Sequence, residues 1–251
     1  MTTADDTYRA VMMTEPPESP TPVDAAEFEN TFGTIWNRPN LSVRERRFVS
    51  LVCVSWAVDI PAIDAHVYAA LKSGDLTIEQ LNEFTLHFAV YCGWPKASQV
   101  EMTVRTQWQR LHAERGEPAP AFPQLQLDDL GPGDAAQRLR AGMQSFEAIN
   151  LVPPPPQDSP YFFAGILNFV FGHVWLRPGL TRRERRLITI PCVGVEESPM
   201  PIWSHVTSAL GSGDLSPLEM HEVIEHFSAY ADTTRASALN DIAQQWQIDN
   251  P

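Results

Sequence analysis

The sequence predicts an all-α fold built as a tandem duplication of one helical unit. Apolar residues recur at helical spacing after helix-capping motifs, and one long pattern occurs twice along the chain. No stretch combines sustained apolar–polar alternation with turn dipeptides, so strands are not expected. These observations together predict an all-α protein with an internal duplication.

The duplicated pattern is long and ungapped. The first copy begins at Phe32 with FGTIWNRPNLSVRERRFVSLVCV, and the second begins 139 residues later, at Phe171, with FGHVWLRPGLTRRERRLITIPCV. Self-similarity at one fixed offset indicates two copies of a large unit rather than a solenoid of short repeats. We therefore divide the chain into a flexible N-terminal arm (1–23), a first repeat (24–115), a Pro-rich linker with a short helix (116–158) and a second repeat (159–251).

The first long helix of each repeat is expected to begin at a capping box. Ser42 precedes Glu45 by three residues, and Thr181 precedes Glu184 in the same way. In a capping box the hydroxyl and the carboxylate each accept a hydrogen bond from an otherwise unpaired backbone N–H. Apolar residues follow each box at helical spacing, which predicts a helix with one buried face.

Three further helices are expected in the first repeat. The second helix ends before Gly74, because glycine readily takes the left-handed angles of a helix C-cap. The third runs over residues 77–91 and the fourth over about 95–112. The second repeat has the matching glycine at Gly213.

Charge and composition exclude several functional classes. The chain has 251 residues, 43% of them hydrophobic, and a formal net charge of −13. Such an acidic chain is unsuited to nucleic acid or to an anionic membrane surface. No signal peptide, membrane span or disulfide framework is visible. We therefore expect a soluble cytoplasmic protein.

One polar stripe stands out on the third helix. Glu83, His87 and Tyr91 are spaced four residues apart and so share one helix face. The same stripe recurs in the second repeat as Glu222, His226 and Tyr230. A histidine oriented by a glutamate can act as general acid or base. The alternative is a partly buried polar seam between helices.

Two histidines and two arginine runs are further candidates. His66 and His205 occupy apolar segments, where a histidine is either a core residue or a catalyst. The RERR runs around Arg47 and Arg186 hold the concentrated positive charge of the chain, and arginine matches the geometry of carboxylates. A solvated helix start with local ion pairs is the alternative.

The cysteines and the metal ligands argue against two chemistries. Cys53 and Cys192 fall on apolar stripes, whereas Cys92 lies at a helix end within YCGWP. Without a CxxC pair, dithiol chemistry has no partner thiol. The histidines also lack a metal-ligand motif such as HExxH, so we expect no metal.

The combined motifs resemble the carboxymuconolactone decarboxylase-like family. They are W-x-RP-x-L-[ST]-x-RER, a helix with His66, then GDLT from Gly74, then the Glu83 stripe and YCGWP. Both copies match, over roughly residues 28–112 and 165–247. The resemblance implies an all-helical, cofactor-free, oligomeric protein. It covers both decarboxylases of lactone acids and alkylhydroperoxidase D-like relatives that use a CxxC pair.

The positions of this sequence favour the decarboxylase branch. The thiols of the peroxidase branch would fall near Asp59 and Ala62, neither of which is a cysteine. By the resemblance, catalysis is assigned to His66, Arg47, Glu45, His87 and Tyr91. Substrate binding is assigned to Trp36, Arg44, Cys92 and Trp94. The second-repeat equivalents are Arg186, His205, His226 and Tyr230.

The resemblance also implies a reaction and an assembly. We expect a carboxy-lyase that uses acid–base chemistry on a small carboxylated or lactone-type substrate. A lactone hydrolase, isomerase or cyclase on the same scaffold is one alternative, and a non-catalytic binding or scaffolding protein is another. Single-copy relatives form rings of six, so a homotrimer is expected. The first repeat is the better candidate, because Asp232 and Thr234 replace the Gly and Pro of YCGWP.

Overall fold

The structure, a computed structural model, describes residues 2–18, 21–123, 133–159, 162 and 165–251. Every regular element within these ranges is helical and none is a strand, which confirms the all-α prediction. We call residues up to 123 the first half and residues from 133 the second half. No helix in the described ranges is long and apolar enough to cross a bilayer.

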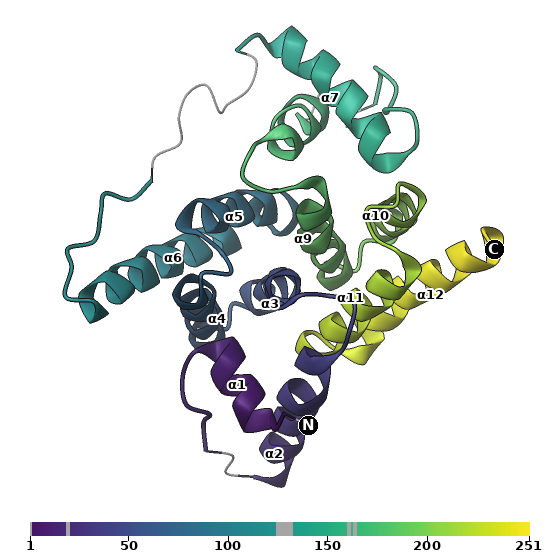
Figure 1. Cartoon of the computed structure of the whole chain (residues 1–251). Coiled ribbons are helices and arrows are strands. Elements are labelled where there is room, and N and C mark those ends of the chain that lie inside the picture. The colour runs from purple at the N-terminus through teal and green to yellow at the C-terminus, as the bar shows by residue number, and fades with distance from the viewer. Residues whose placement is uncertain (1, 19–20, 124–132, 160–161, 163–164) are drawn as a thin grey trace.

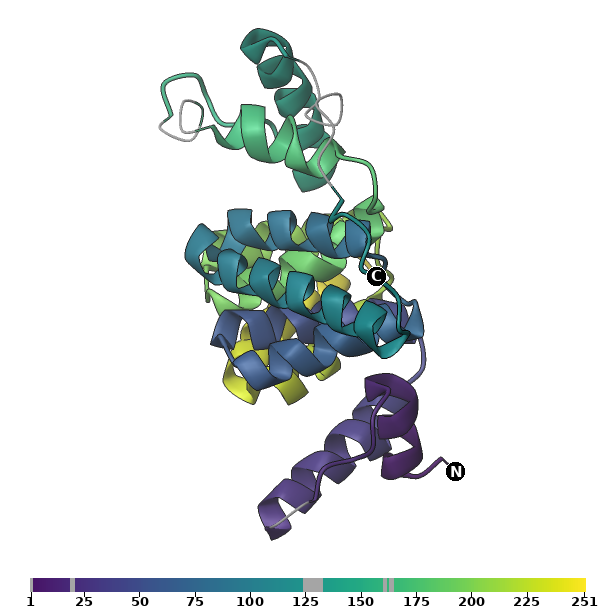
Figure 2. The same ribbon diagram turned by 90° about the vertical axis from the view of Figure 1, so that its left-hand side faces the viewer.

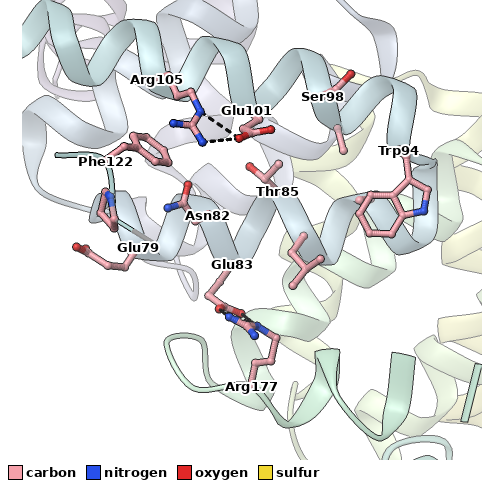
Figure 3. A pocket seen from close by; sticks show the side chains of 14 residues that line it. Glu79, Asn82, Glu83, Thr85, Trp94, Ser98, Glu101, Arg105, Phe122 and Arg177 are labelled. Carbon is pink, nitrogen blue, oxygen red and sulfur yellow. Dashed lines mark hydrogen bonds and ion pairs between the residues drawn. The ribbon is translucent and has the colours of Figure 1, made fainter. Parts of the chain in front are cut away.

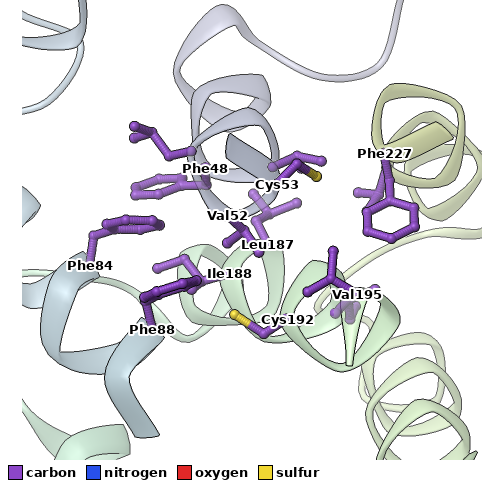
Figure 4. Close-up of a cluster of buried hydrophobic side chains, with 14 of the residues drawn as sticks. Phe48, Val52, Cys53, Phe84, Phe88, Leu187, Ile188, Cys192, Val195 and Phe227 are labelled. Carbon is purple, nitrogen blue, oxygen red and sulfur yellow. The ribbon is translucent and has the colours of Figure 1, made fainter. Parts of the chain in front are cut away.

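Two helices, one from each half, form the centre of the molecule. α3 (Val43–Ala57) and α9 (Arg182–Val195) lie side by side (Figure 1). Both begin at the capping boxes expected from the sequence, where the hydroxyl and the carboxylate each accept a backbone N–H. Their apolar faces meet in the core with phenylalanines from neighbouring helices (Figure 4). The central contacts involve Phe48, Val52, Cys53, Leu187, Ile188 and Cys192.

Three more helices in each half surround this pair. In the first half they are α4 (Ile60–Ser73), α5 (Ile78–Cys92) and α6 (Trp94–Glu114). In the second half they are α10 (Pro199–Gly211), α11 (Pro217–Tyr230) and α12 (Thr233–Asp249). Gly74 ends α4 with a φ of 77°, the left-handed C-cap expected from the sequence.

The packing partners of α5 and α11 are exchanged between the halves. Besides its own neighbour α6, α5 packs against α9 of the second half, and besides α12, α11 packs against α3 of the first half. Figure 1 shows both pairings around the central helices. Consequently, a polar stripe on α5 faces the second half, and the matching stripe on α11 faces the first half.

A smaller helical group caps each end of the central bundle (Figure 2). One group is α1 (Ala4–Met12), α2 (Pro22–Phe28), the π-helical turn Glu29–Thr34 and the 3-10 turn Ile35–Asn37. The other is α7 (Ala135–Asn150), the π-helical turn Ile166–Phe171 and the 3-10 turn Val174–Leu176.

The sequence predicted a flexible arm at the first of these places and a Pro-rich linker with a short helix at the second. In the arm expected over 1–23, Thr3 caps α1, and Val11 and Met12 are buried against Phe32 and Trp36. In the linker expected over 116–158, α7 is a 16-residue helix that packs on α10 and on the Ile166–Phe171 turn. The rest of the linker includes residues 124–132, which lie outside the described ranges. The short helix expected in the linker falls where α7 lies, whereas no helix was expected in the arm.

Candidate functional site

A buried polar cluster joins α3 and α4 of the first half to α11 of the second. α3 supplies two arginines and a serine, α4 a histidine, and α11 the Glu–His–Tyr stripe. We call this set the first cluster: Trp36, Arg38, Arg46, Arg47, Ser50, His66, Glu222, His226 and Tyr230.

Ion pairs and hydrogen bonds to α11 hold the first cluster together. Glu222 accepts from Arg38 Nε at 2.9 Å and from Arg46 Nη2 at 3.1 Å. The Ser50 hydroxyl and His226 Nε2 are 2.7 Å apart. Since Arg46 is fully buried, the carboxylate of Glu222 is what makes its charge tolerable there.

Arg47 and His66 lie on the other side of the same cluster. Arg47 is 1% exposed, and its Nε donates to Asp75 at 2.7 Å while Nη2 donates to the Val11 carbonyl at 2.7 Å. The ring of His66 lies 5.3 Å from that of Tyr230, edge to face. Tyr230 in turn accepts a 2.8 Å hydrogen bond from Trp36 Nε1. An arginine, a histidine and a phenol therefore share one buried space.

A second cluster has the same composition with the halves exchanged. α9 supplies two of its arginines, α10 a histidine, and α5 the Glu–His–Tyr stripe. The second cluster comprises Glu83, His87, Tyr91, Trp175, Arg177, Arg185, Arg186, Thr189 and His205.

The contacts of the second cluster parallel those of the first. Glu83 accepts from Arg177 Nε at 2.9 Å and from Arg185 Nη2 at 3.3 Å. His87 Nε2 lies 2.8 Å from the Thr189 hydroxyl. Tyr91 accepts from Trp175 Nε1 at 2.9 Å, and its hydroxyl is 3.5 Å from His205 Nε2. Arg186 Nη1 is 3.4 Å from His205 Nδ1.

The structure therefore changes the grouping expected within one repeat. His66 and Arg47 share their cluster with His226 and Tyr230, not with His87 and Tyr91. The reason is the exchanged packing of α5 and α11, which turns each stripe toward the opposite half. The sequence left two interpretations of the Glu–His–Tyr stripes, a polar seam between helices and a catalytic site. Both now refer to the same surface, which lies between the two halves.

Burial sets the protonation of both clusters. Burial and the adjacent Arg47 lower the pKa of His66 to about 3, and burial and Arg186 do the same for His205. Burial also lowers the pKa of His87 and His226. At neutral pH these imidazoles are uncharged and can accept a proton or a hydrogen bond.

The pKa values of the cluster tyrosines are shifted upward. Burial raises the pKa of Tyr91 and Tyr230, so both hydroxyls stay protonated at neutral pH. Each cluster thus combines a cationic guanidinium, a neutral imidazole and a neutral phenol. This set can hold an anion and donate a proton to it.

Glu45 and Arg44, two predicted site residues, serve instead at the start of α3. Glu45 accepts from the Ser42 backbone N–H at 2.8 Å and from Arg183 Nε at 2.8 Å. Arg44 Nε donates to Glu184 at 2.9 Å. These contacts cap α3 and α9 and bridge the halves, so neither residue joins a cluster.

Cys92 lies apart from the clusters, and Trp94 lies on a cavity that also borders Glu83 and Arg177 of the second cluster. Cys92 is buried in the apolar core that contains Cys53 and Cys192. Trp94 is 58% exposed and lines a cavity of about 510 Å³ between α5 and α6 (Figure 3). The carboxylates on this cavity are Glu79, Glu83 and Glu101, and its arginines pair with two of them. Its lining is therefore unfavourable for an acidic substrate.

Several cluster residues were not assigned from the sequence. Ser50 and Thr189 bond the stripe histidines, and Arg46 and Arg185 bond the stripe glutamates. The signal was present, because each pair stands 139 residues apart and keeps its chemical type. Within the ranges that the structure describes, no group of three or more His, Cys, Asp or Glu residues could hold a metal ion.

Comparison with known proteins adds to this description of an all-helical protein with paired guanidinium–imidazole–phenol clusters. Residues 24–101 match the Carboxymuconolactone decarboxylase family. Over 94 residues the chain is 31% identical to a nitrosuccinic acid decarboxylase of Metarhizium robertsii, covering 34% of this chain and 65% of that relative. Over 80 residues it is 31% identical to a 4-carboxymuconolactone decarboxylase of Acinetobacter baylyi, covering 32% and 59%.

The match identifies residues 24–101 as a carboxymuconolactone decarboxylase-like region. The chain spans less than two thirds of the length of each of these relatives. The matched region contains the first-half residues of both clusters, from Trp36 to Tyr91.

Proposed function

We propose that the protein is a carboxy-lyase that removes the carboxyl group of a small carboxylated or lactone-type acid without a cofactor. The observation that carries this proposal is the buried grouping of Arg47, His66 and Tyr230. The names of the two relatives support it, because each is a decarboxylase of a small acid. We further propose that the protein is cytoplasmic and arose by tandem duplication.

The chemistry requires a cation and a proton donor in a dry space. Loss of CO₂ leaves an electron pair that moves onto a conjugated oxygen, and a guanidinium such as that of Arg47 stabilises this charge. The carbon then takes up a proton. Tyr230 is the donor in this scheme, because its hydroxyl is protonated whereas His66 is uncharged at neutral pH, and the resulting phenolate regains a proton from water as the product leaves. His66 lies beside Tyr230 and orients the phenol.

Carbon dioxide release from 4-carboxymuconolactone and from nitrosuccinic acid tests the proposal. We expect release from at least one of them, and a decrease of about 100-fold in turnover for Tyr230→Phe and for His66→Gln. Lys72→Gln, on the same helix as His66 but outside both clusters, should retain turnover. If the folded protein releases no CO₂ from either acid, the proposal fails. Lactone opening without CO₂ release would indicate the hydrolase alternative.

We also propose that three chains assemble into a homotrimer. Large apolar side chains remain exposed on the chain, including Trp94, Phe169, Met200 and Trp203. Burying such residues is the usual driving force for oligomer formation. Light scattering coupled to size exclusion should give about three times the chain mass of 28.1 kDa. A single-chain mass at micromolar concentration would contradict this expectation.

A further inference from the structure

The two clusters differ at one position, and this position decides whether a buried arginine N–H has a hydrogen-bond acceptor. In the second cluster, Arg186 Nη1 donates to the Ser208 hydroxyl at 3.0 Å. The residue 139 positions earlier is Ala69, which is fully buried and offers only a methyl group. The corresponding atom, Arg47 Nη1, has no hydrogen-bond partner among the described residues.

The same difference extends over the whole first cluster. Of its buried nitrogens, Arg46 Nη1, Arg47 Nη1, His66 Nδ1 and His226 Nδ1 are without partners within the described chain, whereas Arg46 Nε is unpaired just as Arg185 Nε is in the second cluster. In the second cluster the equivalent histidine nitrogens face arginines, with Arg185 Nη1 3.3 Å from His87 Nδ1 and Arg186 Nη1 3.4 Å from His205 Nδ1. The four first-cluster side chains are at most 5% exposed. Each buried donor left unpaired costs about 1–3 kcal/mol, so an acceptor bound at these guanidinium groups would be stabilised.

We propose that the first cluster, and not the second, binds the substrate's carboxylate. Two carboxylate oxygens can accept several N–H groups at once, and the guanidinium groups of Arg46 and Arg47 and the Nδ1–H tautomer of His66 supply such donors. Formal charge does not separate the clusters, because each sets three arginines against a stripe glutamate and one aspartate, Asp75 or Asp214. The clusters differ instead in their unpaired guanidinium N–H groups, at Arg46 Nη1 and Arg47 Nη1 of the first cluster. This inference rests on the proposed function for the identity of its ligand.

A cavity of about 270 Å³ lies next to the first cluster. Met12 and Ala65 line it, and both pack in the same apolar group as Trp36 and Tyr230. Ala65 directly precedes His66 on α4. The charged side chains on this cavity are Asp64 and Arg110, and no residue of the first cluster lines it.

The exchange of one hydroxyl tests the proposal without removing any cluster residue. Succinate, an unreactive small dicarboxylate, serves as the probe in titration calorimetry with the full chain at neutral pH and low salt. We expect one succinate per chain. Ala69→Ser should weaken binding at least about 10-fold, because the new hydroxyl gives Arg47 the acceptor that Arg186 already has. Ser208→Ala should leave the affinity of this binding event unchanged.

Stability gives a second measurement. Ala69→Ser should raise the melting temperature of the ligand-free protein, since it pairs a buried donor, and it should reduce the shift that succinate produces. Equal affinity in the wild type and Ala69→Ser, two equivalent sites per chain, or no binding would each overturn the inference.

The inference and the proposed function can fail separately. Binding of one succinate without CO₂ release from either acid would retain the carboxylate site and refute the carboxy-lyase. CO₂ release that His66→Gln and His205→Gln reduce equally would retain the carboxy-lyase and refute the difference between the clusters.

Discussion

Lowering the pH from about 7.5 to about 5.5 is expected to remove several kcal/mol from the free energy of unfolding. Burial lowers the pKa of His66 and of His205 to about 3, against 6.5 for an ordinary histidine. The unfolded chain takes up these protons below pH 6.5 and the folded chain does not. The stabilisation is therefore complete above pH 6.5 and is lost progressively as the pH falls toward 3.

The magnitude follows from the size of the shifts. At pH 5.5 each histidine held near 3 costs about 1.4 kcal/mol, and His87 and His226 add to this loss because burial lowers their pKa as well. Urea unfolding at successive pH values measures the slope. His66→Gln should make the slope shallower by up to one proton. A free energy of unfolding that stays constant from pH 7.5 to 5.5 would show that the histidines are not buried as described.

Glu222→Gln is expected to destabilise the protein by about 3–5 kcal/mol, because it leaves Arg46 and Arg38 without their shared carboxylate. Arg46 is fully buried, so water cannot replace the lost charge. Glu83→Gln should have a similar effect through Arg177 and Arg185. A loss of this size is a large part of the stability of a typical domain.

Chemical unfolding of matched variants separates this effect from a general response to lost acidic charge. Glu225 lies one turn from Glu222 on α11 and is partly exposed. Its Oε2 is 3.7 Å from Arg38 Nη1. Glu225→Gln should cost less than about 1 kcal/mol, as solvent-exposed ion pairs usually do. If the Glu222 and Glu225 variants lost the same amount, the buried position of the first pair would not matter.

Local features of the fold were predictable from the sequence. Capping boxes at Ser42 and Thr181 and the C-cap at Gly74 act within a single helix turn, so their residue types are sufficient to predict them. Apolar periodicity likewise predicted the helices that line the core. The candidate residues were recognised because they recur at one fixed offset.

The pairing of candidates was not predictable in the same way. Glu83, His87 and Tyr91 share a helix face in any arrangement, but the sequence does not say which neighbour that face meets. The exchange of α5 and α11 is decided by packing between the halves. Similarly, α1 and α7 follow or precede proline-rich segments, and their helical state depends on burial against the bundle.

This exchanged packing means that neither half can vary independently. A change at Glu83 is balanced at Arg177 or Arg185, which are 94 and 102 residues further along the chain, and not by the nearer Arg46. A recombinant protein that takes one half from a relative would contain arginines of one sequence and glutamates of the other. The ion pairs between the halves would then no longer be matched. Substitutions at the seam should therefore accumulate as matched pairs, one member in each half, and the two halves should diverge in step.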